Sequence, residues 1–211
     1  YGYALPGNPE LASELAARDA SFTHNRTGIY GTMFIAAIIS CAQVMNDKEE
    51  IIRTALKYVP QKSRFFVRSK ICLEEILKAS DWEDGYKKIN NILNEYGHCR
   101  IYQEIGMMIN SFLFANNIYE GICIQVSQGA DTDSFGASVG SLMGCYYGPE
   151  GLDKKWLEIF NDDIHTGMAW FFERSVSNLA KMKTFLQMFS ISILLTGETG
   201  NKIINFQDYN A

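Results

Sequence analysis

Helical patterns follow one another along this chain almost without a gap, and this succession excludes most folds that are organised by a sheet. Alternation of apolar and polar residues, which marks a half-buried strand, is nowhere sustained. No Asn-Gly or Asp-Gly turn joins two apolar runs, because the pair Asp84-Gly85 lies inside a helical pattern. We therefore predict an all-α fold in which residues 1–211 form a single compact bundle of helices.

Polar residues in front of apolar runs predict where several helices begin, since their side chains accept hydrogen bonds from free backbone N–H groups. The predicted caps are Asn8 (with Pro9 behind it), Asp47, Ser63 and Asp81. The expected helices span about residues 9–18, 29–46, 47–59, 63–77, 81–96, 102–116, 119–128, 133–147, 152–160 and 163–189. The polar tail after Gly197 is expected to be loose or a short edge element.

The composition fits one globular domain and argues against two classes of partner. A chain of 211 residues with 47% hydrophobic residues can bury a sizeable core without a disulfide or a structural metal. Its net charge of −5 repels phosphate, so we expect no nucleic acid and no anionic membrane as main partner. The longest apolar stretch, Ile29–Met45, is too short to span a bilayer and reads as a core helix.

The number and spacing of the cysteines indicate in which kind of cellular compartment the protein is expected. They are odd in number, widely spaced and free of any CxxC pair, so we expect small buried hydrophobes in a reducing environment. No signal peptide is visible, and together these features predict a cytoplasmic protein. The cysteines are Cys41, Cys72, Cys99, Cys123 and Cys145.

The densest chemistry lies in four residues between two apolar helices, Asp131-Thr132-Asp133-Ser134. Two carboxylates so close together repel each other unless a cation or a hydrogen-bond network compensates. Carboxylate and hydroxyl oxygens are the ligands that Mg²⁺ prefers, so a metal site is one interpretation. The other is a helix cap, because Asp and Ser are favoured at that position. The residues alone leave both open.

Four glycines follow this loop at every fourth residue, which places them along one face of a helix. Each glycine inside a helix costs about 1 kcal/mol relative to alanine, so their register calls for a reason. The hypothesis is that this face packs in the interior against the backbone of another helix. The glycines are Gly136, Gly140, Gly144 and Gly148.

The segment 128–148, which reads QGADTDSFGASVGSLMGCYYG, resembles the C-terminal signature of the ADP-ribosylglycohydrolase family. Members of that family carry a Gly-Asp-x-Asp-Thr loop followed by a helix of small residues that ends in Tyr-Gly. The resemblance covers about residues 1–165 and nothing is recognised past Phe171. Supporting elements are Leu5–Glu10, Ala16–Ala20, Thr23-His24, Gly97-His98-Cys99, Ile118–Gln128, Trp156 and Asp163.

The resemblance implies an orthogonal α-helical bundle and a set of site residues. Asp131, Asp133 and Ser134 would be metal ligands of a centre with two Mg²⁺ or Mn²⁺ ions. Ser134 departs from the usual threonine but keeps the hydroxyl oxygen. His24 and Gly129 would belong to the substrate site, although His24 could also be a helix-terminal or core histidine.

The remaining family elements are not found in this sequence. They are a Thr-Asp-Asp element with the other metal ligands, the catalytic glutamate and a Gly/Asn-rich pyrophosphate loop, all of which lie in an N-terminal segment of the family. The chain therefore looks like the C-terminal two-thirds of a member, and its partner would be that missing segment of the same polypeptide. No catalytic residue is assigned. A removed segment and a naturally short product both stay open.

The expected function is hydrolysis of the glycosidic bond between ADP-ribose and a modified protein side chain or a small molecule. Two alternatives stay open: a catalytically inactive ADP-ribose-binding or crystallin-like structural protein, and hydrolysis of another glycosidic or amide bond. Other polar residues have simpler interpretations. His98 and His165 are expected to be incidental, and the Asp162-Asp163 pair is read as a solvated helix start.

Overall fold

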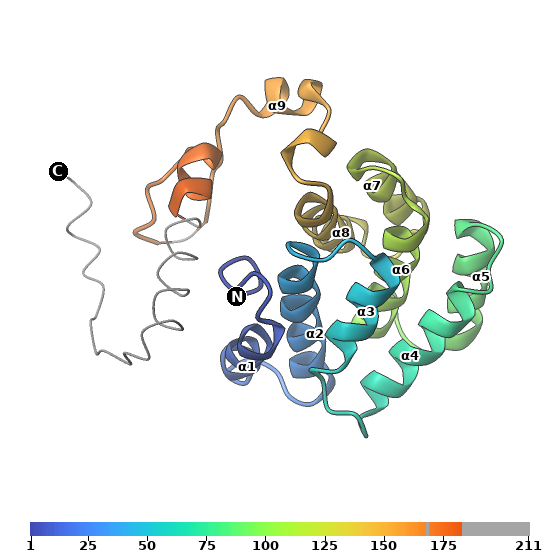
Figure 1. The fold of residues 1–211 in the computed structure, drawn as a ribbon. Coiled ribbons are helices and arrows are strands. Elements are labelled where there is room, and N and C mark those ends of the chain that lie inside the picture. The colour runs from blue at the N-terminus through green and yellow to red at the C-terminus, as the bar shows by residue number, and fades with distance from the viewer. Residues whose placement is uncertain (168, 183–211) are drawn as a thin grey trace.

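The computed structural model describes residues 1–167 and 169–182, and in these ranges the chain is helical without a named strand (Figure 1). The predicted all-α fold is confirmed. The helices are α1 (Pro9–Ala20), α2 (Thr27–Ala42), α3 (Lys48–Leu56), α4 (Arg64–Ile76), α5 (Trp82–Leu93), α6 (Ile101–Phe114), α7 (Ile118–Ser127), α8 (Thr132–Tyr147), the 3-10 helix η1 (Pro149–Gly151) and α9 (Lys154–Phe160).

All four predicted caps are confirmed, and each works in the same way. The capping side chain accepts a hydrogen bond from the backbone N–H three residues further on, which satisfies a donor that has no partner inside the helix. The pairs are Asn8 with Leu11 (3.2 Å), Asp47 with Glu50 (2.7 Å), Ser63 with Phe66 (3.1 Å) and Asp81 with Asp84 (2.8 Å).

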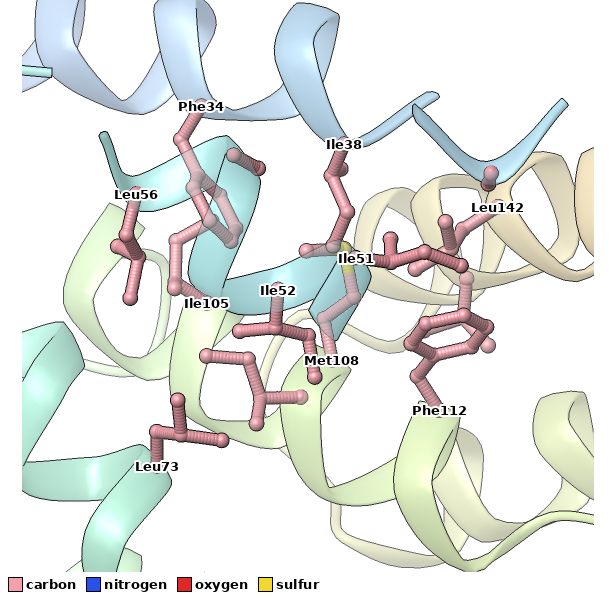
Figure 2. Close-up of a cluster of buried hydrophobic side chains, with 14 of the residues drawn as sticks. Phe34, Ile38, Ile51, Ile52, Leu56, Leu73, Ile105, Met108, Phe112 and Leu142 are labelled. Carbon is pink, nitrogen blue, oxygen red and sulfur yellow. The ribbon is translucent and has the colours of Figure 1, made fainter. Parts of the chain in front are cut away.

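Two helices, α2 and α6, organise the packing. Helix α2 contacts α1, α3, α4, α6 and α8, while α6 contacts every helix from α2 to α5 as well as α7 and α8. Every residue from Ile105 to Phe112 of α6 is buried, as expected for a helix with neighbours all round. Figure 2 shows the cluster that forms where α2 and α6 meet α3, α4 and α8. Its labelled side chains are Phe34, Ile38, Ile51, Ile52, Leu56, Leu73, Ile105, Met108, Phe112 and Leu142.

The predicted glycine face of α8 is wrong for most of its length. A Cβ on Gly140 would lie 3.6 Å from the Ile122 side chain, which is ordinary contact, and one on Gly144 would meet nothing within 4 Å among the described residues. Gly148 lies beyond the helix, where it forms the C-cap with φ of 68°. The reason is geometric: the buried face of α8 carries the large side chains Phe135, Val139, Leu142 and Met143, and the glycines lie beside it.

The expected helix over 163–189 is also wrong at its start. Residues 163–167 and 169–175 are not helical, and Asp163 forms an isolated bridge with Ser175. Helical residues begin only at 176 and continue through 182, and the rest of the predicted helix lies outside the described residues, as does the tail after Gly197. The Asp162-Asp163 pair is exposed but does not begin a helix there, because its carboxylates bind Ser175 and Arg174.

The cysteines divide into two groups, so the expectation that all are buried is wrong in part. Cys41 and Cys72 are buried, Cys145 is half-buried, and Cys99 and Cys123 are exposed. All five are free thiols. Cys99 lies on the loop between α5 and α6, at the edge of the site described next.

Candidate functional site

A cleft of about 1080 Å³ lies between the loop that leads into α2 and the loop that leads into α6. Residues 22–28 form one wall, and residues 95–97 and 99–102 form most of the other, with Glu104 beside them. Thr27 and Tyr102 join the two walls through a hydroxyl–hydroxyl hydrogen bond of 3.2 Å. The cleft is therefore built on the first turns of α2 and α6.

His24 lines this cleft, just in front of the first turn of α2. Its imidazole is exposed, and Nδ1 lies 2.8 Å from the Thr23 hydroxyl. The ring packs over the first turn of α2, where a Cβ on Gly28 would come within 2.8 Å of it. The alternative of a core histidine is excluded by this exposure, while substrate binding by His24 stays a prediction.

Basic side chains were missed in the sequence analysis, yet two of them line the same cleft. Arg26 and Arg100 are exposed, and each is the N-cap residue of the helix behind it. Neither gives its helix a side-chain cap bond. Arg26 also has a positive φ of 44°, which is uncommon for a residue with a Cβ and is typical of functional loops.

The capping pattern of the α-helices distinguishes this region from the rest of the described chain. Helices α1, α3, α4, α5, α7 and α9 each have a side-chain cap. The three without one, α2, α6 and α8, all begin at or beside the cleft. Uncapped helix N-termini carry free N–H groups and partial positive charge, which favour an anion. In the sequence, the sign of this cleft was that Arg26 and Arg100 occupy N-cap positions where a capping side chain is usual.

The acidic loop lies beside the cleft, although its residues are not among those that line it. Asp131 is the N-cap of α8 but does not cap it with its side chain, so the capping interpretation is wrong for this residue. Its carboxylate shares a hydrogen bond with the Asp133 carboxyl group and accepts one from Ser134, and these bonds hold the pKa of Asp131 below its ordinary value. The Cys99 thiol of the cleft also bonds to Asp131.

The backbone in front of Asp131 turns through two successive residues with positive φ, Gly129 (78°) and Ala130 (63°). Glycine adopts this conformation easily, whereas alanine does so at a cost. Gly129 has open space where its Cβ would be. The loop therefore needs Gly129 for its shape, and a part in binding substrate stays a prediction for this residue.

Glu104 is the acidic residue that the sequence analysis missed. It lies one turn into α6, lines the cleft and is half-buried. Its Oε1 accepts a hydrogen bond of 2.8 Å from Ser138 of α8. Burial raises the pKa of Glu104, and the nearby charge of Asp131 raises it further. A glutamate in the first turn of a helix is common, so nothing in the sequence marked this residue as part of a site.

The donor atoms in the loop are of the kind that hard cations prefer. Asp131, Asp133 and Ser134 supply two carboxylates and a hydroxyl. Within residues 1–167 and 169–182, however, no group of three or more His, Cys, Asp or Glu residues is placed to hold a metal. The loop therefore fits one side of a coordination shell, and a complete shell needs further ligands.

Comparison with known proteins bears on the whole described chain. The model of the ADP-ribosylglycohydrolase family matches residues 1–181, well past the point near residue 165 where the resemblance in the sequence ended. No curated protein and no solved structure matched the chain. Among the described helices, none has the length and apolar character that crossing a membrane requires.

Proposed function

Because the chain belongs to the ADP-ribosylglycohydrolase family, we propose that it hydrolyses the glycosidic bond between ADP-ribose and a modified protein side chain or small molecule. The family supports a hydrolase that acts on ADP-ribosylated substrates. The single observation that carries the proposal for this chain is that the two facing sides of the cleft bring together two uncapped helix N-termini and three basic side chains, a set of groups that we call the phosphate wall.

That wall suits the diphosphate of ADP-ribose. In the first turns of α2 and α6, the N–H groups of Gly28 and Gln103 already donate to the Asn25 and Arg100 carbonyls. The remaining N–H groups of these turns can donate to phosphate oxygens, and the helix dipoles favour negative charge there. His24, Arg26 and Arg100 add donors beside these N–H groups, and hydrogen bonds from charged donors to phosphate are strong. A protein with a net charge of −5 thus carries a local anion site.

The family is metal-dependent, and the acidic loop is the part of this chain that would hold the ions. We propose Asp131, Asp133 and Ser134 as ligands of Mg²⁺ or Mn²⁺ in a binuclear centre. When bound, such ions supply a water molecule of lowered pKa and offset negative charge. The other ligands would come from the family's Thr-Asp-Asp element, which the 211 residues do not contain.

Glu104 is the acid–base group that we place in the cleft. Its carboxylate lies between the phosphate wall and the acidic loop, and Ser138 fixes one of its oxygens. A carboxyl group with a raised pKa holds a proton closer to neutral pH, which suits proton transfer to or from a reacting oxygen. His24 would orient the substrate from the side of the cleft that faces Glu104.

A second candidate is supported by one specific observation. Within the described residues no group of three or more His, Cys, Asp or Glu is placed to hold a metal, and an inactive ADP-ribose-binding or crystallin-like protein of the same fold would need none. That protein would use the phosphate wall and not the acidic loop. For either function we propose a cytoplasmic location, supported by five free thiols that suit a reducing compartment.

Titration calorimetry of ADP-ribose with the full-length protein tests the phosphate wall. Removing one charged donor to phosphate costs about 1.5–3 kcal/mol, so Arg100→Ala should weaken binding by about tenfold or more. Arg64→Ala is the matched control, because Arg64 is an exposed first residue of a helix that Ser63 caps. Equal affinities for wild type and Arg100→Ala would contradict the proposed site. Turnover of an ADP-ribosylated substrate by the same protein separates the hydrolase from the inactive binding protein.

A further inference from the structure

A buried network of amide and hydroxyl side chains joins α6 to the end of α7, directly in front of the acidic loop. Its members are almost fully enclosed: Asn110, Ser111 and Gln125 are 0% exposed and Gln128 is 3% exposed. Asn110 and Ser111 come from the middle of α6, whereas Gln125 and Gln128 lie one turn apart at the C-terminal end of α7. Neither the proposed metal ligands nor the phosphate wall includes any of them.

Gln128 is the most connected member of this network. Its Oε1 accepts a hydrogen bond of 2.9 Å from the Asn110 amide. Its Nε2 donates to the Ser111 hydroxyl at 2.8 Å and to the Met107 carbonyl at 3.3 Å. The Asn110 amide also donates to the Trp82 carbonyl at 2.8 Å, which extends the network to α5. Both ends of the Gln128 amide are therefore bound to the centre of the bundle.

A buried polar side chain that has its partners is held firmly, because breaking its bonds leaves unpaired groups away from water. Gln128 is also the C-cap residue of α7, and its backbone N–H donates to the Ile124 carbonyl. Only Gly129 and Ala130 separate it from Asp131, and both have positive φ. The loop thus leaves the bundle from a fixed point and turns through two residues of unusual conformation to reach the carboxylate.

We propose that Gln128 is a positioning residue, whose buried amide fixes the conformation of the loop 129–131 and so the place of the Asp131 carboxylate. This inference rests on the proposed function where it concerns metal binding, but the effect on the loop is independent of it. Loss of the amide would let the loop sample other conformations, and the strain at Ala130 would favour its release.

Gln125 offers a matched control within the same network. It is equally buried, its Oε1 lies 2.9 Å from the Ser111 hydroxyl, and it belongs to the same helix one turn earlier. A substitution there removes a buried amide as well, but it leaves the side chain in front of the loop untouched. If the network were only a source of stability, the two methionine variants would differ in melting temperature, and neither would speed exchange selectively in the loop.

Hydrogen exchange measured by mass spectrometry on the full-length protein tests the inference. Gln128→Met should raise the exchange rate of the Gly129 and Phe135 amides, which donate to the Val126 and Asp131 carbonyls, at least tenfold over wild type. It should weaken Mn²⁺ binding in calorimetry by a similar factor. Gln125→Met should show neither change, and its melting temperature should fall less, because the buried Nε2 of Gln125 has no hydrogen-bond partner among the described residues. Gln128→Asn, which keeps an amide but shortens its reach, should act in the same direction and serves if the methionine variant does not fold.

The outcomes separate the inference from the proposed function. Unchanged exchange of the Gly129 and Phe135 amides, or an equal rise in both methionine variants, would overturn the positioning role. Faster exchange in Gln128→Met alone supports it. If that faster exchange came with unaltered Mn²⁺ affinity, the loop would still be positioned by Gln128, and the proposed metal role of Asp131 would be the part that fails.

Discussion

Glu104 of α6 accepts a hydrogen bond of 2.8 Å from the hydroxyl group of Ser138 on α8. Through this bond the cleft on the first turns of α2 and α6 is connected to the helix that begins at the acidic loop. A charged carboxylate held half-buried beside other carboxylates is costly, which is why such an arrangement is more typical of a functional site than of a structural one.

The raised pKa of Glu104 predicts a pH-dependent stability. Because its folded pKa lies above its unfolded pKa, Glu104 contributes stability that is present at acidic pH and is lost as the pH rises through the folded pKa. Glu104→Gln does not titrate, so the melting temperature of this variant relative to wild type should be higher at pH 7.5 than at pH 4. Thermal unfolding followed by circular dichroism measures the difference.

Glu83→Gln is the control for this measurement. Glu83 also lies in the first turn of a helix, but it is exposed, so its variant should show no such gain over wild type at pH 7.5. A Glu104→Gln variant whose advantage does not grow with pH would refute the account of a desolvated carboxylate.

Gly85 and Gly144 should respond oppositely to the same substitution. A Cβ on Gly85 would lie 2.1 Å from Oδ1 of the buried Asn110, so Gly85→Ala must displace that network and should destabilise by about 1–3 kcal/mol. Gly144 has open space, so Gly144→Ala should gain up to about 1 kcal/mol of helix propensity. Chemical denaturation of both variants checks this, and a loss at Gly144 would show a neighbour that the account does not contain.

Lys48 holds the start of α3 against three aromatic rings. Its Nζ lies 5.6 Å from the centroids of Phe112 and Tyr146 and 5.4 Å from that of Tyr147, and it donates to the Ala115 carbonyl. Lys48→Met keeps the length of the side chain but loses the cation, so the free energy of unfolding should fall by about 0.5–2 kcal/mol. The exposed Lys62→Met serves as the control in the same denaturation series, and equal stabilities would argue against the interaction.

Local signals in the sequence predicted the fold, whereas contacts between distant segments did not follow from it. Asn8, Asp47, Ser63 and Asp81 act within three residues of themselves, so their caps could be read directly. The side of α8 that meets the core depends on where α2, α6 and α7 lie, and the spacing of its glycines did not reveal this.

The residues of the candidate site also fall into two groups, those that a local sequence signal revealed and those that only the fold brings together. The acidic loop was visible because Asp131 and Asp133 are close in sequence and belong to a family motif. Arg26 and Arg100 come from segments more than seventy residues apart, and only the fold brings them to one cleft. Glu104 lies in the first turn of a helix, where a glutamate is ordinary. The absence of a capping residue in front of α2 and α6 was the local sign of that cleft, and it becomes meaningful once the other helices are seen to be capped.

Replacement of Asp133 by asparagine in the full-length protein tests most directly whether the acidic loop holds a catalytic ion. Asparagine keeps the volume and one acceptor oxygen but loses the charge that a hard cation requires. Asp47→Asn is the control, since Asp47 only caps α3 and asparagine caps nearly as well. We predict that Asp133→Asn abolishes release of ADP-ribose from an ADP-ribosylated substrate and weakens Mn²⁺ binding, with helical circular dichroism and melting temperature unchanged. Near-normal turnover by Asp133→Asn would contradict the metal assignment.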